Sequence, residues 1–314
     1  MENKGLRIVV ASVGVPPILD ALLKSDHSVV GILDYSSPRR KKSLIRSAYK
    51  LLKSILKRHP NNLQKIGRYY DIPWIHATVQ DEQDIVRFLD ELCADLLVTC
   101  TCPLLSEAVF KKPRYGSINV HMSLLPKYRG AHPDFWTVFS GEKEGGVTVH
   151  FINSNIDKGS IIKQSSFPIE PGISESEYRY RALAKTAPDL LLEALSDIKS
   201  GHVNLLLQPD ISPTVYAHRM GPQSIKNMLT DEIYSIEQIW RVLRFCKDWD
   251  GILPSISGWR KCYTWCIQQY NKNVPSKVPP GFIGKDRHGY YLGHAQGIIR
   301  LKYKVSAKYI LREL

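Results

Sequence analysis

The sequence contains few cysteines and no long apolar segment, and both shortages narrow the class of protein. Six cysteines stand among the 314 residues, and no two of them form a C-x-x-C pair. We therefore expect neither a zinc site nor a disulfide framework. No apolar run approaches the ~18 residues that a membrane span needs. The chain leads directly into a strand-like segment, residues 6–11, without a signal-peptide pattern, so a reducing, cytoplasmic location is the simplest expectation.

Acidic residues are absent from residues 35–70, although eleven lysines and arginines are found there. This basic helical insertion carries most of the net charge of +13, so any interaction with a polyanion should involve it and not the whole protein. Within it, residues 39–58 combine an apolar face with a basic stripe, the pattern of an amphipathic helix. Three roles fit such a helix: a solvated face packed on the core, docking on a membrane surface or an acidic partner, or contact with nucleic-acid (RNA) phosphates.

A dinucleotide-binding fingerprint is also missing, because the turn at residues 11–16 has one glycine in place of G-x-G-x-x-G. The surrounding sequence alternates short apolar strands with helical patterns, which predicts an α/β fold with a mostly parallel sheet. Strands are expected near residues 8–10, 28–33, 72–75, 95–100, 116–121, 147–152 and 161–164, and helices near residues 18–23, 81–92, 104–110 and 175–199. Pro188 should kink or split the last helix, and Gly201 should end it.

The last third of the chain has a different pattern, and we place a domain boundary near His202. Residues 206–230 contain prolines and are expected to form a loop, followed by a helix near residues 236–245. Short strand patterns with glycine turns then predict a small antiparallel, barrel-like domain. These strands are expected near residues 263–267, 281–284, 290–293 and 297–303. The predicted domains are residues 1–202 and residues 203–314.

The segment 116–130 brings an amide and an imidazole together at a strand end. Asn119 and His121 stand two residues apart in an apolar strand, so both side chains point to the same face of the sheet. A loop bounded by Pro126 and Gly130 follows at once, and strand ends of α/β folds are common sites of chemistry. An amide can stabilise an oxyanion and an imidazole can transfer a proton, which suggests acyl transfer. On this motif alone, a buried structural pair is an equally good interpretation.

Three linked motifs resemble those of the 10-formyltetrahydrofolate-dependent formyltransferases. They are Asn119-x-His121-x-Ser123-Leu-Leu-Pro126-Lys-Tyr-Arg-Gly130, Gly141-Glu-x-Glu-x-Gly-Val-Thr148 and Asp157-x-Gly159, in this order. The resemblance spans roughly residues 6–200 and implies a Rossmann-like catalytic domain without a dinucleotide, followed in larger members by an OB-like C-terminal barrel. It also implies that 10-formyltetrahydrofolate donates a formyl group to a primary amine without a metal. One departure from the family pattern is Ser160, where many members have aspartate.

By the same resemblance, the catalytic residues are Asn119, His121 and Asp157. Asn119 and a protonated His121 would stabilise the oxyanion, while Asp157 would orient His121 or relay the proton through water. Taken alone, Asp157 would be better interpreted as an Asx-turn cap. Folate is expected along two segments with apolar side chains and backbone hydrogen-bonding groups: Cys102, Pro103, Leu104 and Leu105, and Ser123, Leu124, Leu125, Pro126 and Gly130. For Leu104 and Leu105, ordinary core burial is an equal alternative.

The acceptor amine is the least defined part of the prediction. The pattern around Trp136 and His150 resembles formyltransferases of nucleotide-linked amino sugars, although Trp136 also fits a core aromatic position. The predicted acceptor-binding residues are Lys127, Tyr128, Arg129, Trp136 and His150. Methionyl-tRNA is the alternative acceptor, whereas the intact catalytic set disfavours an inactive scaffold that binds RNA or a membrane surface. The expected substrate is a small-molecule amine, most simply a sugar nucleotide, and a homodimer is one option for assembly.

Overall fold

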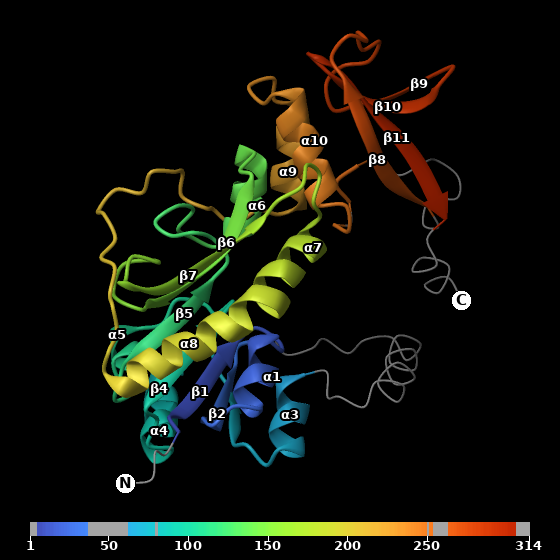
Figure 1. Cartoon of the computed structure of the whole chain (residues 1–314). Helices are drawn as coiled ribbons and strands as arrows, with labels where there is room; N and C mark the ends of the chain where they lie inside the picture. Colours follow the sequence, from blue (N-terminus) through green and yellow to red (C-terminus); the bar gives the residue numbers. More distant parts are fainter. Residues whose placement is uncertain (1–4, 37–61, 79–80, 250, 254–262, 306–314) are drawn as a thin grey trace. The chain divides into compact units, whose positions relative to one another are not determined.

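The computed structural model describes residues 5–36, 62–78, 81–249, 251–253 and 263–305, and the chain divides into two compact units (Figure 1). The first unit comprises residues 1–129, 146–167 and 180–215, and the second comprises residues 130–145, 168–179 and 216–314. The predicted basic helix at residues 39–58 lies outside the described residues, so its role stays a prediction, as does the domain boundary near His202. Among the described residues, no helix is long and apolar enough to cross a bilayer.

A seven-stranded sheet forms the centre of the first unit. Its strands are β1 (Arg7–Ser12), β2 (Ser28–Asp34), β3 (Trp74–His76), β4 (Leu96–Cys100), β5 (Ser117–His121), β6 (Glu144–Phe151) and β7 (Ile161–Pro168). They are ordered β3-β2-β1-β4-β5-β6-β7. The pairs from β3 to β5 are parallel, whereas β5 and β6 are antiparallel. The mostly parallel α/β sheet predicted from the alternating patterns is confirmed.

Helices cover this sheet because its central strands are apolar along nearly their whole length. β1 and β4 are almost continuously buried, which is typical of parallel strands with both faces covered. On one face, Val9 of β1 and Leu97 of β4 pack with Leu89 of α4 (Glu82–Glu91). The other helices of this unit are α1 (Ile18–Leu23), α3 (Leu63–Tyr69), α5 (Glu107–Phe110) and α8 (Ala187–Ser200), of which α1 and α8 contact one another.

The long helical segment around Pro188 changes type but is not interrupted. Pro188 lies in the first turn of α8, and a π-helical turn, η1 (Tyr180–Thr186), precedes this helix. Proline has no backbone N–H and its ring clashes with a carbonyl one turn earlier, so a wider turn before it accommodates both effects. At the other end, Gly201 adopts the left-handed conformation that caps α8, as expected of a glycine stop.

The second unit combines helices with a four-stranded antiparallel sheet of order β8-β11-β10-β9. Its elements are α6 (Pro133–Ser140), α7 (Glu175–Arg179), α9 (Pro222–Thr230), α10 (Ile236–Phe245), β8 (Tyr263–Asn271), β9 (Ile283–Asp286), β10 (Gly289–His294) and β11 (Gly297–Val305). The ring of Phe135 in α6 packs edge-on against Phe245 in α10, with 6.0 Å between ring centroids. The smaller antiparallel β domain predicted for the tail is confirmed.

The prediction of a loop at residues 206–230 is wrong for its last part, because residues 222–230 form α9. Pro222 stands in the first turn, where its missing N–H costs nothing, so it starts this helix and does not oppose it. Ile225, Met228 and Leu229 follow at helical spacing and give α9 a buried face. The apolar spacing therefore outweighs the nearby prolines in this stretch.

Candidate active site

Four polar side chains form a block on one face of the sheet, where β5 and β6 pair. Asn119 lies opposite His150, and His121 lies opposite Thr148. Residues two apart in a strand share a face, and directly opposite partners in an antiparallel pair do too, so all four side chains point the same way. His121, Thr148 and His150 are buried. The sequence pattern Asn119-x-His121 therefore becomes one half of a polar block whose other half comes from the next strand of the sheet.

Thr99 fixes the orientation of the Asn119 amide. The two residues are register partners in β4 and β5, and the Thr99 hydroxyl donates a hydrogen bond to Asn119 Oδ1 at 2.8 Å. With its oxygen engaged, the amide directs Nδ2 toward His150 Nε2, 3.3 Å away, and toward Asp157 Oδ1, 3.5 Å away. The donor end of Asn119 is thus presented to the centre of the site.

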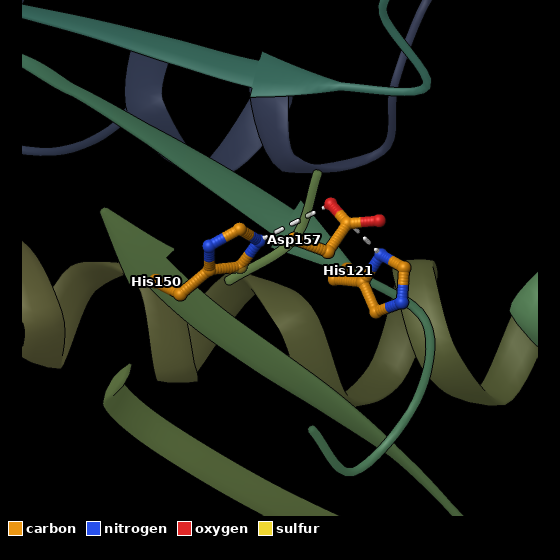
Figure 2. Close-up of side chains that lie close together, drawn as sticks. All are labelled: His121, His150 and Asp157. Carbon is orange, nitrogen blue, oxygen red and sulfur yellow. Dashed lines mark ion pairs between the residues drawn. The ribbon is translucent and has the colours of Figure 1, made fainter. Parts of the chain in front are cut away.

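Asp157 reaches the same place from the turn between β6 and β7. Its Oδ1 lies 3.7 Å from His121 Nδ1 and 3.6 Å from His150 Nε2, between the two rings (Figure 2). The backbone of Asp157 has φ of 49°, in the left-handed region that aspartate tolerates better than most residues with a Cβ. The three residues predicted to be catalytic therefore come together, and His150 joins them.

Both histidines bind backbone carbonyls through their outer ring nitrogens. His121 Nε2 lies 3.0 Å from the Tyr128 carbonyl, and His150 Nδ1 lies 2.8 Å from the Phe151 carbonyl. A carbonyl only accepts, so these outer nitrogens carry the hydrogen in the neutral ring, and the inner nitrogens keep their lone pairs. Two lone pairs and a carboxylate then face one another, an arrangement in which a hydrogen-bond donor such as an amine can bind. The inner atoms lie within 4.8 Å of one another, which a metal ion could also bridge, so the expectation of no metal stays a prediction.

The turn that carries Asp157 is closed through its main chain. The Phe151 N–H donates to the Ser160 carbonyl at 2.9 Å. Since Ser160 contributes a backbone group here, its departure from the more common aspartate leaves this contact intact. Gly159 lies so close to Phe151 that a Cβ would come within 1.8 Å of the Phe151 carbonyl oxygen. The absence of a side chain at Gly159 is therefore a steric requirement of the turn.

Thr148 and Gln164 hold the loop that follows β5. The Thr148 hydroxyl donates to the Ser123 carbonyl at 2.6 Å and accepts from the Leu125 N–H at 3.1 Å. Gln164 Nε2 donates both to the Thr148 hydroxyl, at 2.8 Å, and to the Leu125 carbonyl, at 2.6 Å. Residues 123–125, predicted to border the folate, are therefore fixed by side chains of β6 and β7.

Replacing Thr148 with valine should lower the free energy of unfolding by about 2–4 kcal/mol. Valine keeps the volume of threonine, but it leaves the buried Leu125 N–H and one Gln164 donor without this acceptor, at about 1–3 kcal/mol each. Guanidinium unfolding at equilibrium measures the change. Thr137→Val is the control, because Thr137 is also buried but its hydroxyl donates only within its own helix, to the Pro133 carbonyl. Equal losses in the two variants would contradict the special role of Thr148.

Tyr128 and Arg129, both predicted to bind the acceptor, contact residues 206–214, a segment that we call the strap. The buried Arg129 guanidinium donates to Gln208 Oε1 and to the carbonyls of Pro209 and Asp210. Burial lowers the pKa of Arg129, an effect opposed by nearby carboxylates. Arg129 therefore uses most of its donors on the chain itself, and acceptor binding by this residue stays a prediction.

The two residues before Arg129 also take part in local hydrogen bonds. The Lys127 carbonyl accepts from the Ser123 hydroxyl at 2.8 Å, and the Tyr128 N–H donates to Thr214 Oγ1 of the strap at 2.7 Å. Tyr128 has φ of 57°, and its carbonyl is the acceptor for His121. The main chain of Tyr128 thus connects the strap to the His121 ring.

Trp136 and Gly130 belong to the second unit. Trp136 is half-buried, its indole N–H donates to the His218 carbonyl at 2.9 Å, and its ring lies edge-on to Phe139. Gly130 has φ of 125°, and a Cβ there would lie 2.7 Å from the Ala217 carbonyl oxygen. Close packing thus requires glycine at position 130, and the predicted ligand contacts of both residues stay predictions.

The predicted folate segment at residues 102–105 follows the end of β4. Leu104 is 65% exposed, whereas Cys102, Pro103 and Leu105 are half-buried. Cys102 and Leu105 pack against the core cluster of the first unit, so the alternative of ordinary core burial holds in part for Leu105. Burial also raises the pKa of the Cys102 thiol, which keeps it neutral. Leu104 remains as an apolar side chain that faces solvent at a strand end.

Comparison with protein families decides the class of this site. The model of the family described as "Formyl transferase" matches residues 7–195. The chain belongs to the formyl transferase family. It is therefore a formyl-transfer enzyme, as its three linked motifs predict. This formyltransferase is 26% identical over 282 residues to methionyl-tRNA formyltransferase of Flavobacterium johnsoniae, and the alignment covers 88% of this chain and 79% of the relative.

Solved structures share the fold of the formyltransferase over nearly its whole length. The N-formyltransferase of Helicobacter canadensis, in complex with folinic acid and dTDP-3-aminofucose, has a TM-score of 0.61 at 17% identity, covering 96% of this chain and 99% of that one. The sugar 3N-formyl transferase WlaRD has a TM-score of 0.58 at 17% identity, covering 96% and 98%. HypX of Aquifex aeolicus has a TM-score of 0.56 at 15% identity, and the match covers 94% of this chain and 43% of HypX. At these identities the likeness shows the fold.

The sequence-based prediction missed the residues that hold the predicted catalytic groups in place. Thr99, Thr148 and Gln164 are absent from the predicted site, as is Gln208. For Thr148 a signal existed, because Thr148-x-His150 repeats on the next strand the two-residue spacing of Asn119-x-His121. The other three have no comparable local pattern, since their partners lie on other strands or loops.

Proposed function

We propose that this formyltransferase moves the formyl group of 10-formyltetrahydrofolate to the primary amine of a nucleotide-linked amino sugar. The observation that carries the formyl transfer is the cluster of Asn119, His121 and Asp157, where an amide donor and a proton-binding pair face one space. The cluster lies at the carboxyl end of β5, the usual place for ligands in an open α/β sheet. The assignments of folate as donor and of an amino sugar as acceptor depend on further observations.

The proposed mechanism assigns a role to each of these groups. Attack of the amine on the formyl carbon forms a tetrahedral intermediate with an oxyanion. Asn119 Nδ2, oriented by Thr99, donates a hydrogen bond to this oxygen, and His121 donates a second one once it is protonated. The amine gives up a proton to the His121–Asp157 pair, and the folate nitrogen takes up a proton as its bond to the formyl carbon breaks. The enzyme returns to its starting protonation state without a covalent intermediate.

Two features support folate as the donor. The exposed Leu104 at the end of β4 offers an apolar surface to a flat heterocycle, and the loop at residues 123–125 is held in a fixed path beside His121. Structures with the same fold were solved with tetrahydrofolic acid, 5-N-formyl-THF or folinic acid bound. We therefore assign the donor site to residues 102–105 and 123–126, with Gly130 as a further contact.

The acceptor proposal rests on sequence pattern and on fold. Two sugar N-formyltransferases align with this chain over nearly the full length of both partners, including the C-terminal part. Lys127, Tyr128, Trp136 and His150 are the proposed acceptor-binding residues, together with Arg129. Methionyl-tRNA is the second candidate, because the tRNA enzyme of Flavobacterium johnsoniae is 26% identical over 282 residues.

A direct comparison of acceptors tests the proposal. We expect the purified protein, given 10-formyltetrahydrofolate, to formylate a dTDP-linked 3-amino sugar or a UDP-linked 4-amino sugar, and not methionyl-tRNA. Mass spectrometry of each acceptor detects the added formyl group, and tetrahydrofolate release gives the rate. The Asp157→Asn protein serves as the inactive control.

The outcomes distinguish the proposed formyl transfer from the proposed acceptor. Formylation of methionyl-tRNA alone would overturn the amino-sugar assignment and leave formyl transfer intact. Formylation of neither acceptor class, with no tetrahydrofolate released, would count against both assigned acceptors.

A further inference from the structure

The strap, residues 206–214, runs along the loop that follows β5 and the turn that carries Asp157. It begins at Leu206, which forms an antiparallel bridge with Ile161 through two backbone hydrogen bonds of 2.9 Å each. It continues past the turn of Asp157 to Ser212, whose hydroxyl donates to the Pro126 carbonyl at 2.8 Å. The strap thus contacts the loop after β5 and the turn after β6.

Gln208 uses both ends of its amide within this segment. Its Nε2 donates to the Asp157 carbonyl at 3.0 Å and to the Gly159 carbonyl at 2.7 Å. Its Oε1 accepts from Arg129 Nε at 3.2 Å and from Arg129 Nη2 at 3.0 Å. One side chain therefore holds the carbonyls on both sides of Lys158 and also binds the end of the loop 123–129.

The backbone of Asp157 needs such support, because φ of 49° is unfavourable for a residue with a Cβ. A small rotation of this turn would move the carboxylate, which lies 3.7 Å from His121 Nδ1 and 3.6 Å from His150 Nε2. Fixing the carbonyl of Asp157 and that of Gly159 restricts this rotation. Gln208 thereby holds Asp157 at its distance from the histidines.

The strap is also connected to His121, the residue that Asp157 faces. Thr214 Oγ1 accepts the Tyr128 N–H at 2.7 Å, and the Tyr128 carbonyl accepts from His121 Nε2 at 3.0 Å. His121 is therefore held through Tyr128, and Asp157 is held through Gln208, by the same short segment.

We propose that the strap sets the spacing of the His121–Asp157 pair, with Gln208 as the positioning residue for Asp157. The inference rests on the proposed formyl transfer, in which this pair moves the proton. Gln208 does not touch the reacting atoms in this scheme. It acts on the rate through the turn at residues 157–159.

The Gln208→Glu substitution distinguishes the donor role of the Gln208 side chain from its acceptor role. Glutamate keeps an acceptor for Arg129 but has no donor for the carbonyls of Asp157 and Gly159. We expect kcat to fall by about 10–100-fold, the scale of a small misplacement of a catalytic group, while KM for donor and acceptor changes by less than about threefold. Hydrogen exchange should rise in peptides that cover residues 153–160, a readout that does not depend on turnover.

Asp210→Asn is the matched control, because Asp210 lies two residues further along the strap. Its side chain is 95% exposed and pairs with Lys158 of the same turn at 2.8 Å. An exposed pair of this kind contributes little, so kcat and the exchange of residues 153–160 should stay within about twofold of wild type.

The inference would be overturned by an unchanged kcat in Gln208→Glu, by unchanged exchange at residues 153–160, or by equal effects in Asp210→Asn. A loss of kcat matched by a general loss of hydrogen-exchange protection across β1 and β4 would indicate a structural role alone, and would also overturn it. If the wild-type protein transfers no formyl group, the proposed function fails, and the exchange data still decide whether Gln208 holds the turn.

Discussion

Asp157→Asn should lower kcat for formyl transfer by about two to four orders of magnitude, the range for a lost acid–base group. Asn matches Asp in size, so the turn and the Gln208 contacts to its backbone remain. What disappears is the charge that lies 3.7 Å from His121 Nδ1 and 3.6 Å from His150 Nε2. Without it, a protonated ring loses its counter-charge and the proton from the amine has no favourable place to go.

The measurement is the rate of tetrahydrofolate release at saturating donor and acceptor. His121→Ala should fall within the same range, because it removes the ring that takes the proton. Asp210→Asn makes the same chemical change on an exposed side chain and should retain activity. A kcat for Asp157→Asn within tenfold of wild type would show that the assignment of Asp157 is wrong.

Gly159→Ala should have a comparably large effect, for a steric reason. A Cβ at this position would lie 1.8 Å from the Phe151 carbonyl oxygen and 2.7 Å from its carbonyl carbon. Both obstacles are backbone atoms of β6, next to His150, so the turn itself must move. We expect a loss of about 3 kcal/mol or more in unfolding free energy and at least a hundredfold loss in kcat, because the movement displaces Asp157.

Thermal unfolding and the same rate assay measure the two effects of Gly159→Ala. Gly221→Ala is the control: an added Cβ there meets no atom of the described residues within 4 Å, and φ is −146°, which alanine readily adopts. This variant should lose less than about 1 kcal/mol, the usual cost of alanine at a helix N-cap. Equal stability of the two variants would contradict the close approach of Gly159 to β6.

The parts of the structure that local pattern defines could be predicted from the sequence. The apolar strands and the two-residue spacing of Asn119 and His121 depend only on strand geometry, and both reappear in β5. The change of helix type beside Pro188 and the stop at Gly201 follow from the chemistry of single residues. The link from this pair to Asp157 came from a family resemblance, because nothing local connects residues 38 positions apart.

The groups that hydrogen-bond to the predicted catalytic residues could not be predicted in the same way. Thr99 is 20 residues from Asn119 in sequence, and only the pairing of β4 with β5 makes them neighbours. Gln208 lies 51 residues from Asp157, in a stretch whose composition indicated only a loop. A threonine or a glutamine has no sequence signature of its own, so register and loop path must be known before its role is visible.

Most of the hydrogen bonds that hold this site end on main-chain carbonyls. The carbonyls of Tyr128 and Phe151 accept hydrogen bonds from the two histidines, and the Pro126 carbonyl accepts one from Ser212. The carbonyls of Asp157 and Gly159 both accept from Gln208. A carbonyl is the same whichever side chain its residue bears. Where the side chain itself has no further role, as at Ser160, it can therefore change while the main-chain hydrogen bond is kept. A scaffold of this kind can diverge toward new amines by point mutation without first losing its chemistry.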